Sequence, residues 1–195
     1  MIRMQVSERM IFEAEEFVSA MKYPSYEGRP DYKEEHKLIG ALGEIALIDF
    51  CWKNDLLAFK NEGYSSDVKL YSGHTIEVKT QKVASVPEMH YVVAVASRQK
   101  DIETSDFMFF TRLQYVAGIP EAVWLLGGCS RDKFWRLSEA HIAGDPMMND
   151  HKDGGRSFSG RYFTTDAHTL PINQLAPPSA AIKHFKSLQE KEQAS

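Results

Sequence analysis

A helix-length segment that is apolar on nearly every side most restricts how this chain can fold. Between Lys33 and Lys53 the apolar side chains surround the predicted helix; they are Leu38, Ile39, Ala41, Leu42, Ile45, Ala46, Leu47, Ile48 and Phe50. Such a helix needs cover on all faces and therefore lies inside the core. After Asn54 the pattern changes to short strands, at 56–60, 66–70, 75–80, 90–97, 107–113 and 122–126. The order predicts an α/β fold, a mixed central β-sheet flanked by helices.

Further helices and a long loop complete the predicted organisation. An amphipathic pattern with Ser7 as N-cap predicts a helix over 7–22, and Ser130 predicts the cap of a helix over 131–140. The segment 144–160 is rich in Gly, Asp and Asn, which predicts a long mobile loop. A strand near 161–165 and a polar helix after Pro178 follow. We expect a single domain over 1–195, with a core at about 33–140 and a C-terminal loop and helix extension at 144–195.

Composition narrows the classes of function. With 23 basic and 27 acidic side chains the net charge is −4, which argues against coating nucleic acid by bulk positive charge but leaves a local basic groove open. No segment approaches the roughly 18–20 uncharged apolar residues of a membrane helix. Glu8 and Glu13 near the N-terminus argue against a signal peptide, and the isolated Cys51 and Cys129 against a disulfide framework. We expect a cytoplasmic protein with no membrane partner.

Two predicted strands carry acids that the turn between them brings together. Strand side chains alternate between faces, so Glu77 and Lys79 share one face, as do Asp67 and Lys69. A three-residue loop over 71–73 sets Asp67 opposite Glu77, whereas a two-residue turn separates them. The three-residue class favours a left-handed residue at its third position, which is a glycine here. The sequence therefore favours the register that joins the two carboxylates.

Opposed carboxylates repel unless a cation lies between them. Lys79 is near enough to be that cation. One interpretation of the three residues is therefore a surface ion cluster. Glu44 on the apolar helix adds a third carboxylate, which is costly to bury unless it pairs with a buried Arg or Lys, reaches the helix edge or binds a metal. With Asp67 and Glu77 it would form a hard-oxygen site suited to Mg²⁺ or Mn²⁺.

These residues carry a family resemblance. The chain has Gly43-Glu44 in an apolar helix, then Asp67, then nine residues, then Glu77-Val78-Lys79 on a strand. This order resembles the PD-(D/E)XK nuclease superfamily, which includes restriction endonucleases and Holliday-junction resolvases. Ser66 stands where the motif has proline. The match covers about 33–97 and, more loosely, the strand at 122–126 and the helix after it.

The resemblance implies a restriction-endonuclease-like core and hydrolysis of nucleic-acid phosphodiester bonds by metal-activated water. It makes Asp67, Glu77, the carbonyl of Val78 and Glu44 the ligands of Mg²⁺ or Mn²⁺. Lys79 would orient or activate the water and offset charge on the phosphate. DNA is the expected partner; RNA as a substrate and a homodimer both stay open.

Four further residues are candidates for contacts with nucleic acid. Gln81 and Lys82 follow the motif, and Lys152 and Arg156 lie in the predicted loop. Each either contacts a phosphate backbone or is an ordinary solvated side chain. Two alternatives to a nuclease remain, a catalytically inactive module of the same fold that binds nucleic acid or protein, and an interaction protein whose charged cluster is only a surface network.

Overall fold

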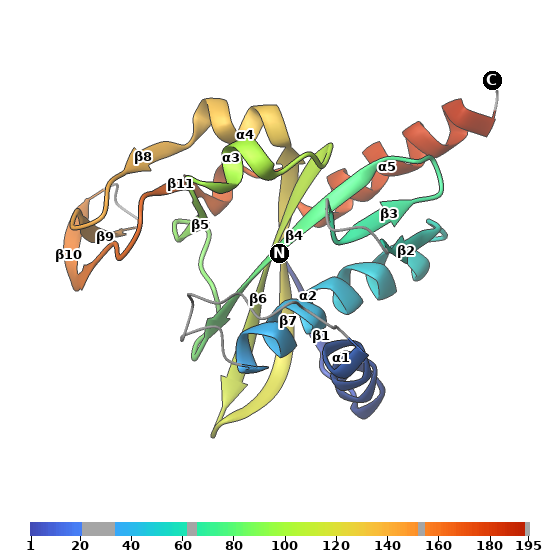
Figure 1. Cartoon of the computed structure of the whole chain (residues 1–195), viewed down its shortest axis with the longest axis horizontal. Coiled ribbons are helices and arrows are strands. Elements are labelled where there is room, and N and C mark those ends of the chain that lie inside the picture. The colour runs from blue at the N-terminus through green and yellow to red at the C-terminus, as the bar shows by residue number, and fades with distance from the viewer. Residues whose placement is uncertain (21–33, 62–65, 152–154, 194–195) are drawn as a thin grey trace.

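The computed structural model describes residues 1–20, 34–61, 66–151 and 155–193, and within them a six-stranded mixed sheet forms the centre (Figure 1). Its strands, in spatial order, are β1 (Ile2–Gln5), β7 (Ile119–Ser130), β6 (Phe107–Val116), β4 (Thr75–Val83), β3 (Val68–Leu70) and β2 (Ala58–Lys60). Strands β4 and β6 run parallel, and the other neighbours are antiparallel. The predicted α/β class and mixed sheet are confirmed.

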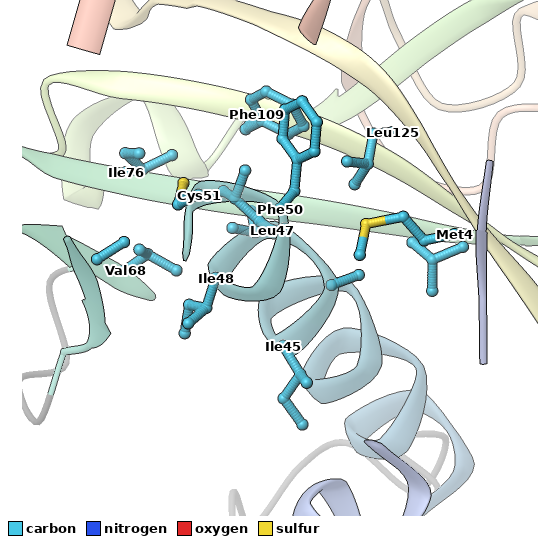
Figure 2. Packing of buried hydrophobic residues seen from close by; sticks show 14 of the residues in the cluster. Met4, Ile45, Leu47, Ile48, Phe50, Cys51, Val68, Ile76, Phe109 and Leu125 are labelled. Carbon is cyan, nitrogen blue, oxygen red and sulfur yellow. The ribbon is translucent and has the colours of Figure 1, made fainter. Parts of the chain in front are cut away.

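The apolar helix lies inside the core, as its sequence predicts. Helix α2 (Glu34–Trp52) packs against the sheet, and Leu42, Ala46, Leu47 and Cys51 are fully buried. Figure 2 shows side chains of this helix meeting those of the sheet; the labelled sheet residues are Met4, Val68, Ile76, Phe109 and Leu125. Helix α1 (Glu8–Ala20) packs beside α2, and α5 (Pro178–Gln193) adds Ala181, Ile182 and Phe185 to the same core.

A glycine sets how closely α2 approaches the sheet. A Cβ added at Gly43 would lie 1.9 Å from Oγ1 of Thr80 and 2.7 Å from Oγ1 of Thr111. These two hydroxyl groups, on β4 and β6, hydrogen-bond to each other at 2.9 Å. The next residue of the helix is Glu44, so this contact fixes the distance from Glu44 to the sheet.

Local signals placed several boundaries correctly. Oγ of Ser7 accepts a hydrogen bond from the Met10 amide at 3.3 Å, and Oγ of Ser130 accepts one from the Lys133 amide at 3.3 Å. Helix α4 (Arg131–Leu137) ends earlier than expected, because the chain turns into strand β8 (Glu139–His141). Strand β1 was not predicted from the sequence; it is stabilised by pairing with the distant β7.

The predicted mobile loop over 144–160 is wrong. This segment contains β9 (Pro146–Asp150) and most of β10 (Arg156–Tyr162), which pair as an antiparallel hairpin. Gly160, with φ of +78°, lies where the register of β10 shifts, so glycine there accommodates a bulge rather than preventing a strand. Of the strand expected at 161–165, only the first two residues are strand, as the end of β10; the other three lie in the connection to β11 (Ala167–Pro171).

A second, smaller sheet packs against the side of the central sheet away from α2. Its order is β5 (Val92–Ala96), β11, β8, and a short helix α3 (Gln99–Ile102) follows β5, while the turn η1 (Ile172–Gln174) follows β11. A second core joins them to the central sheet; its fully buried members are Met108, Phe110, Phe134, Leu170 and Ile172. Figure 1 shows this sheet and the β9–β10 hairpin extending to the left of the central strands. Among the described residues, no helix is long and apolar enough to cross a membrane.

Candidate functional site

The β3–β4 hairpin has the register that the sequence favours. Val68 pairs with Ile76, and the Leu70 amide donates to the His74 carbonyl at 2.8 Å. The pairing ends at Val68–Ile76, and the amide of Asp67, the next residue outward, donates to the Ile76 carbonyl at 3.2 Å, so the expected pair of Asp67 with Glu77 is not part of the ladder. The loop 71–73 ends in a glycine with φ of +82°, which is the left-handed conformation expected at that position.

Asp67 lies where β3 parts from β4. Its Oδ2 accepts a hydrogen bond from the backbone amide of Val78 at 2.7 Å, so the carboxyl group sits at the edge of β4, between the two faces of the sheet. Burial and, next, the charge of the nearby Glu44 raise the pKa of Asp67 to about 7, against the opposing effect of the Val78 amide. Side chains on either face of the sheet can therefore approach the carboxyl group of Asp67.

Glu77 and Lys79 form an ion pair on β4. The interpretation as a surface ion cluster does not fit this pair, since the side chains of Glu77 and Lys79 are only 13% and 19% exposed. In the parallel register they stand beside Met108 and Phe110, which belong to the second core, so the smaller sheet covers this face. Burial, followed by the charge of Asp67, raises the pKa of Glu77 to about 8.

Glu44 reaches the cluster from α2, on the other face of the sheet. It is 8% exposed, and its Oε2 lies 3.3 Å from Nζ of Lys60, a partner on β2 that the sequence reading did not single out. Burial raises the pKa of Glu44 and lowers that of Lys60, while each charge partly offsets the shift of the other. Strand alternation could have indicated Lys60, because it shares the inward side of β2 with the fully buried Ala58.

A fourth acid also escaped the sequence analysis. Glu103 follows α3, is buried, and accepts a hydrogen bond from the Ser105 amide at 2.8 Å. Its charge contributes to the raised pKa of both Asp67 and Glu77. No motif or periodicity marks this loop residue, so it could not be found from the sequence.

We call the six groups Glu44, Lys60, Asp67, Glu77, Lys79 and Glu103 the acidic cluster. Four carboxyl groups and two ammonium groups leave an excess of two negative charges when all are ionised. Hard carboxylate oxygens with such an excess fit a divalent cation such as Mg²⁺ or Mn²⁺. Within the described ranges, no three His, Cys, Asp or Glu side chains already form a grouping suited to a metal ion.

The other predicted contact residues lie apart from the cluster. Lys82 pairs with Glu35 and its ammonium lies 4.2 Å from the Tyr115 ring centroid, while Arg156 pairs with Glu139 at 3.2 Å. Gln81 is exposed and lines a cavity described below. Lys152 falls outside the described residues.

The raised pKa values predict how pH affects the metal-free protein. Asp67 and Glu77 titrate near 4 when unfolded and at about 7 and about 8 when folded, so between these limits the folded state binds more protons. Stability therefore falls as pH rises through this window. We expect the melting temperature in chelator to drop by a few degrees per pH unit between about pH 5 and pH 7. Thermal denaturation across this range checks it; a melting temperature that rises would contradict the burial of these acids.

Comparison with known proteins gives no match. No family model, no curated protein and no solved structure matches this chain. The likeness to nucleases therefore rests on the motif residues alone. Function has to be inferred from the chemistry of the site, because a fold by itself does not determine an activity.

Proposed function

We propose that this protein is a metal-dependent endonuclease of the PD-(D/E)XK type that hydrolyses phosphodiester bonds in DNA in the cytoplasm. The observation that carries the proposal is the grouping of two acids and a lysine on β4: Asp67 accepts from the Val78 amide, its charge acts on Glu77, and Lys79 pairs with Glu77. Surface ion networks are solvated, whereas Glu77 and Lys79 are largely buried, and burial raises the pKa of both Asp67 and Glu77. The central sheet with α2 on one face is compatible with a restriction-endonuclease-like core.

The residues that would hold the metal are Asp67, Glu77 and the carbonyl oxygen of Val78, with Glu44 as a further ligand or a neighbour that positions them. A bound Mg²⁺ or Mn²⁺ would polarise a phosphoryl oxygen and lower the pKa of a coordinated water. The chain contributes a fixed geometry for that ion, because the Val78 amide orients Asp67 and the core holds β4.

Lys79 has the second role in the proposed reaction. Its ammonium group lies against the carboxyl group of Glu77 and is largely shielded from solvent. Its three N–H donors can orient a water molecule and counter negative charge that develops on a phosphate. Such a charge acts more strongly where bulk water is excluded, since screening is weaker there.

Cleavage of supercoiled plasmid and of labelled oligonucleotides tests the proposal. We expect nicking or linearisation with Mg²⁺ or Mn²⁺ and none with chelator. Absence of metal-dependent cleavage across DNA duplexes, single strands, branched DNA and RNA would overturn it. A co-purified nuclease is excluded by running a Glu77→Ala preparation, purified identically, beside the wild type.

The inactive alternative has one observation in its favour. Lys60 contacts Glu44 and Lys79 contacts Glu77, so two of the carboxyl groups already have internal counter-charges. A module that binds nucleic acid or protein without cutting needs no metal ion, so these internal ion pairs would be enough to balance the two carboxyl groups. Retained DNA binding without cleavage under every metal condition would favour it.

Glu44→Gln separates a catalytic from a structural role for this residue. The amide keeps the shape of the side chain but removes the charge that faces Lys60. We expect cleavage to fall about 10–100-fold, as for residues that orient metal ligands, with a smaller effect on stability. Cleavage rates and melting curves are compared with those of Glu13→Gln on α1. A large loss of stability with full activity would make Glu44 only the ion-pair partner of Lys60.

A further inference from the structure

A cavity of about 370 Å³ lies between the central sheet and the β9–β10 hairpin, apart from the acidic cluster. Gln81 of β4 and Arg112 of β6 line it from the sheet, and Met148 and Arg161 line it from the hairpin. Its volume is in the range of sites that hold a small ligand or one unit of a polymer. No Asp or Glu is among its lining residues.

Arg112 is the unusual residue of this cavity. It is only 6% exposed, its Nη2 donates to the Val92 carbonyl at 2.9 Å, and its Nε has no hydrogen-bond partner. The guanidinium carbon lies 5.1 Å from the Tyr91 ring centroid, and burial lowers the pKa of the group. Within the described part of the chain no carboxylate forms an ion pair with it. A buried cation of this kind is costly unless an anion approaches it.

The remaining donors of the cavity complete a site for an anion. Arg161 is exposed and lines the cavity from the hairpin, and Gln81 supplies an amide group from β4. Two guanidinium groups with an amide match the oxygens of a phosphate, which guanidinium binds in bidentate fashion. Tyr91 and Met148 also line the cavity, and their ring and thioether surfaces are of the kind against which a sugar or base packs.

The position of the cavity relates it to the proposed catalytic residues. Glu77, Lys79 and Gln81 alternate along β4 and so share one face, and Gln81 is level with Arg112 in the β4–β6 register. Four residues of strand place Gln81 about 13 Å from Glu77, at roughly 3.3 Å per residue. A strand of nucleic acid whose cleaved phosphate lies at Glu77 can therefore reach this cavity with a neighbouring nucleotide.

We propose that this cavity binds a phosphate group of the nucleic-acid substrate, held by Arg112 and Arg161 with Gln81 as a further donor. The identity of the ligand rests on the proposed nuclease function. The phosphate comes either from within the strand or from a 5′-phosphorylated end, and both present negatively charged non-bridging oxygens, of which the terminal group has one more.

Binding measured without cleavage tests the inference. Fluorescence anisotropy of labelled oligonucleotides in chelator, over a series of salt concentrations, is applied to the full chain and to Arg161→Ala, Gln81→Ala and Arg112→Gln. Arg136→Ala on α4 is the matched control, because Arg136 is exposed and lies outside the cavity. We expect Arg161→Ala to weaken binding roughly tenfold or more and to lower the salt slope by about one, with the control within twofold.

The buried Arg112 needs a separate safeguard. If Arg112→Gln does not fold, the binding measured for Arg161→Ala and Gln81→Ala still tests the inference, because both of these residues are exposed. Oligonucleotides with and without a 5′-phosphate distinguish the two sources, since a terminal site gains affinity from that group and loses the gain in Arg161→Ala. Equal affinities of Arg161→Ala, Gln81→Ala and the control would overturn the inference.

The outcome can be told apart from that of the nuclease proposal. If wild type cleaves DNA and the cavity variants bind and cleave like the control, the cavity inference fails and the nuclease stands. If wild type never cleaves but binds a deoxynucleoside monophosphate in a way that depends on Arg161, the phosphate site stands and the nuclease fails. If neither nucleic acid nor the monophosphate binds, both are overturned.

Discussion

We expect Glu77→Ala and Lys79→Ala each to abolish the metal-dependent DNA cleavage proposed for this chain. We expect losses of at least about 10²–10³-fold, because one change removes a ligand and the other removes the charge that faces the reacting phosphate. Both side chains are largely buried, so each truncation also leaves its former partner without a counter-charge. Cleavage is therefore measured well below the melting temperature of each variant.

The matched control is Lys69→Ala, which removes an exposed lysine from the neighbouring strand β3. It changes the net charge as Lys79→Ala does and leaves the acidic cluster intact. Glu77→Gln and Lys79→Met keep the side-chain volume and separate lost chemistry from lost packing. Near wild-type cleavage by any folded variant at position 77 or 79 would remove these residues from the mechanism.

Metal binding should stabilise the folded chain, and Asp67 should be required for that effect. An ion that binds only the folded state stabilises it by about 2.7 kcal/mol at one hundred times Kd, which is about 5–10 °C for a chain of this size. Asp67→Asn removes a proposed ligand and a half-buried carboxylate together, while its amide oxygen can still accept from the Val78 amide. The metal-free variant should melt at or above wild type, and its response to metal should shrink.

Melting curves with chelator and with Mg²⁺ or Mn²⁺, at matched ionic strength, decide the point. A purely structural ion network predicts the reverse pattern, no metal response in wild type and a small loss of stability on neutralising Asp67. A metal shift that survives Asp67→Asn unchanged would place the ion elsewhere in the molecule.

The parts of the site that could be predicted are those determined by neighbouring residues. The β3–β4 register follows from a three-residue loop that ends in Gly73, and the burial of α2 follows from its own composition. A turn class and an apolar helix are local properties, so no knowledge of the remaining chain is needed. The meeting of Asp67 with Glu77 could thus be anticipated from eleven consecutive residues, 67–77.

The parts that could not be predicted depend on distant segments. Glu77 and Lys79 are covered because β5 pairs with β11, more than seventy residues later, and this sheet closes over β4. The β9–β10 hairpin has a composition typical of loops, and Gly160 only becomes informative once the register shift is known. Lys60 and Glu103 join the cluster through tertiary packing, which leaves no pattern in the sequence around Glu103.

The contact of Gly43 with Thr80 and Thr111 makes the helix–sheet spacing a determinant of the site. Glu44 follows Gly43 in the chain, so the helix cannot move outward without carrying that carboxylate away from Lys60 and the edge of β4. Any side chain at position 43 has to displace either the helix or the two hydroxyl groups. Even one added methyl group at position 43 would therefore change the spacing between α2 and the sheet. With that spacing the position of Glu44 would also change relative to the acids on the other face of the sheet.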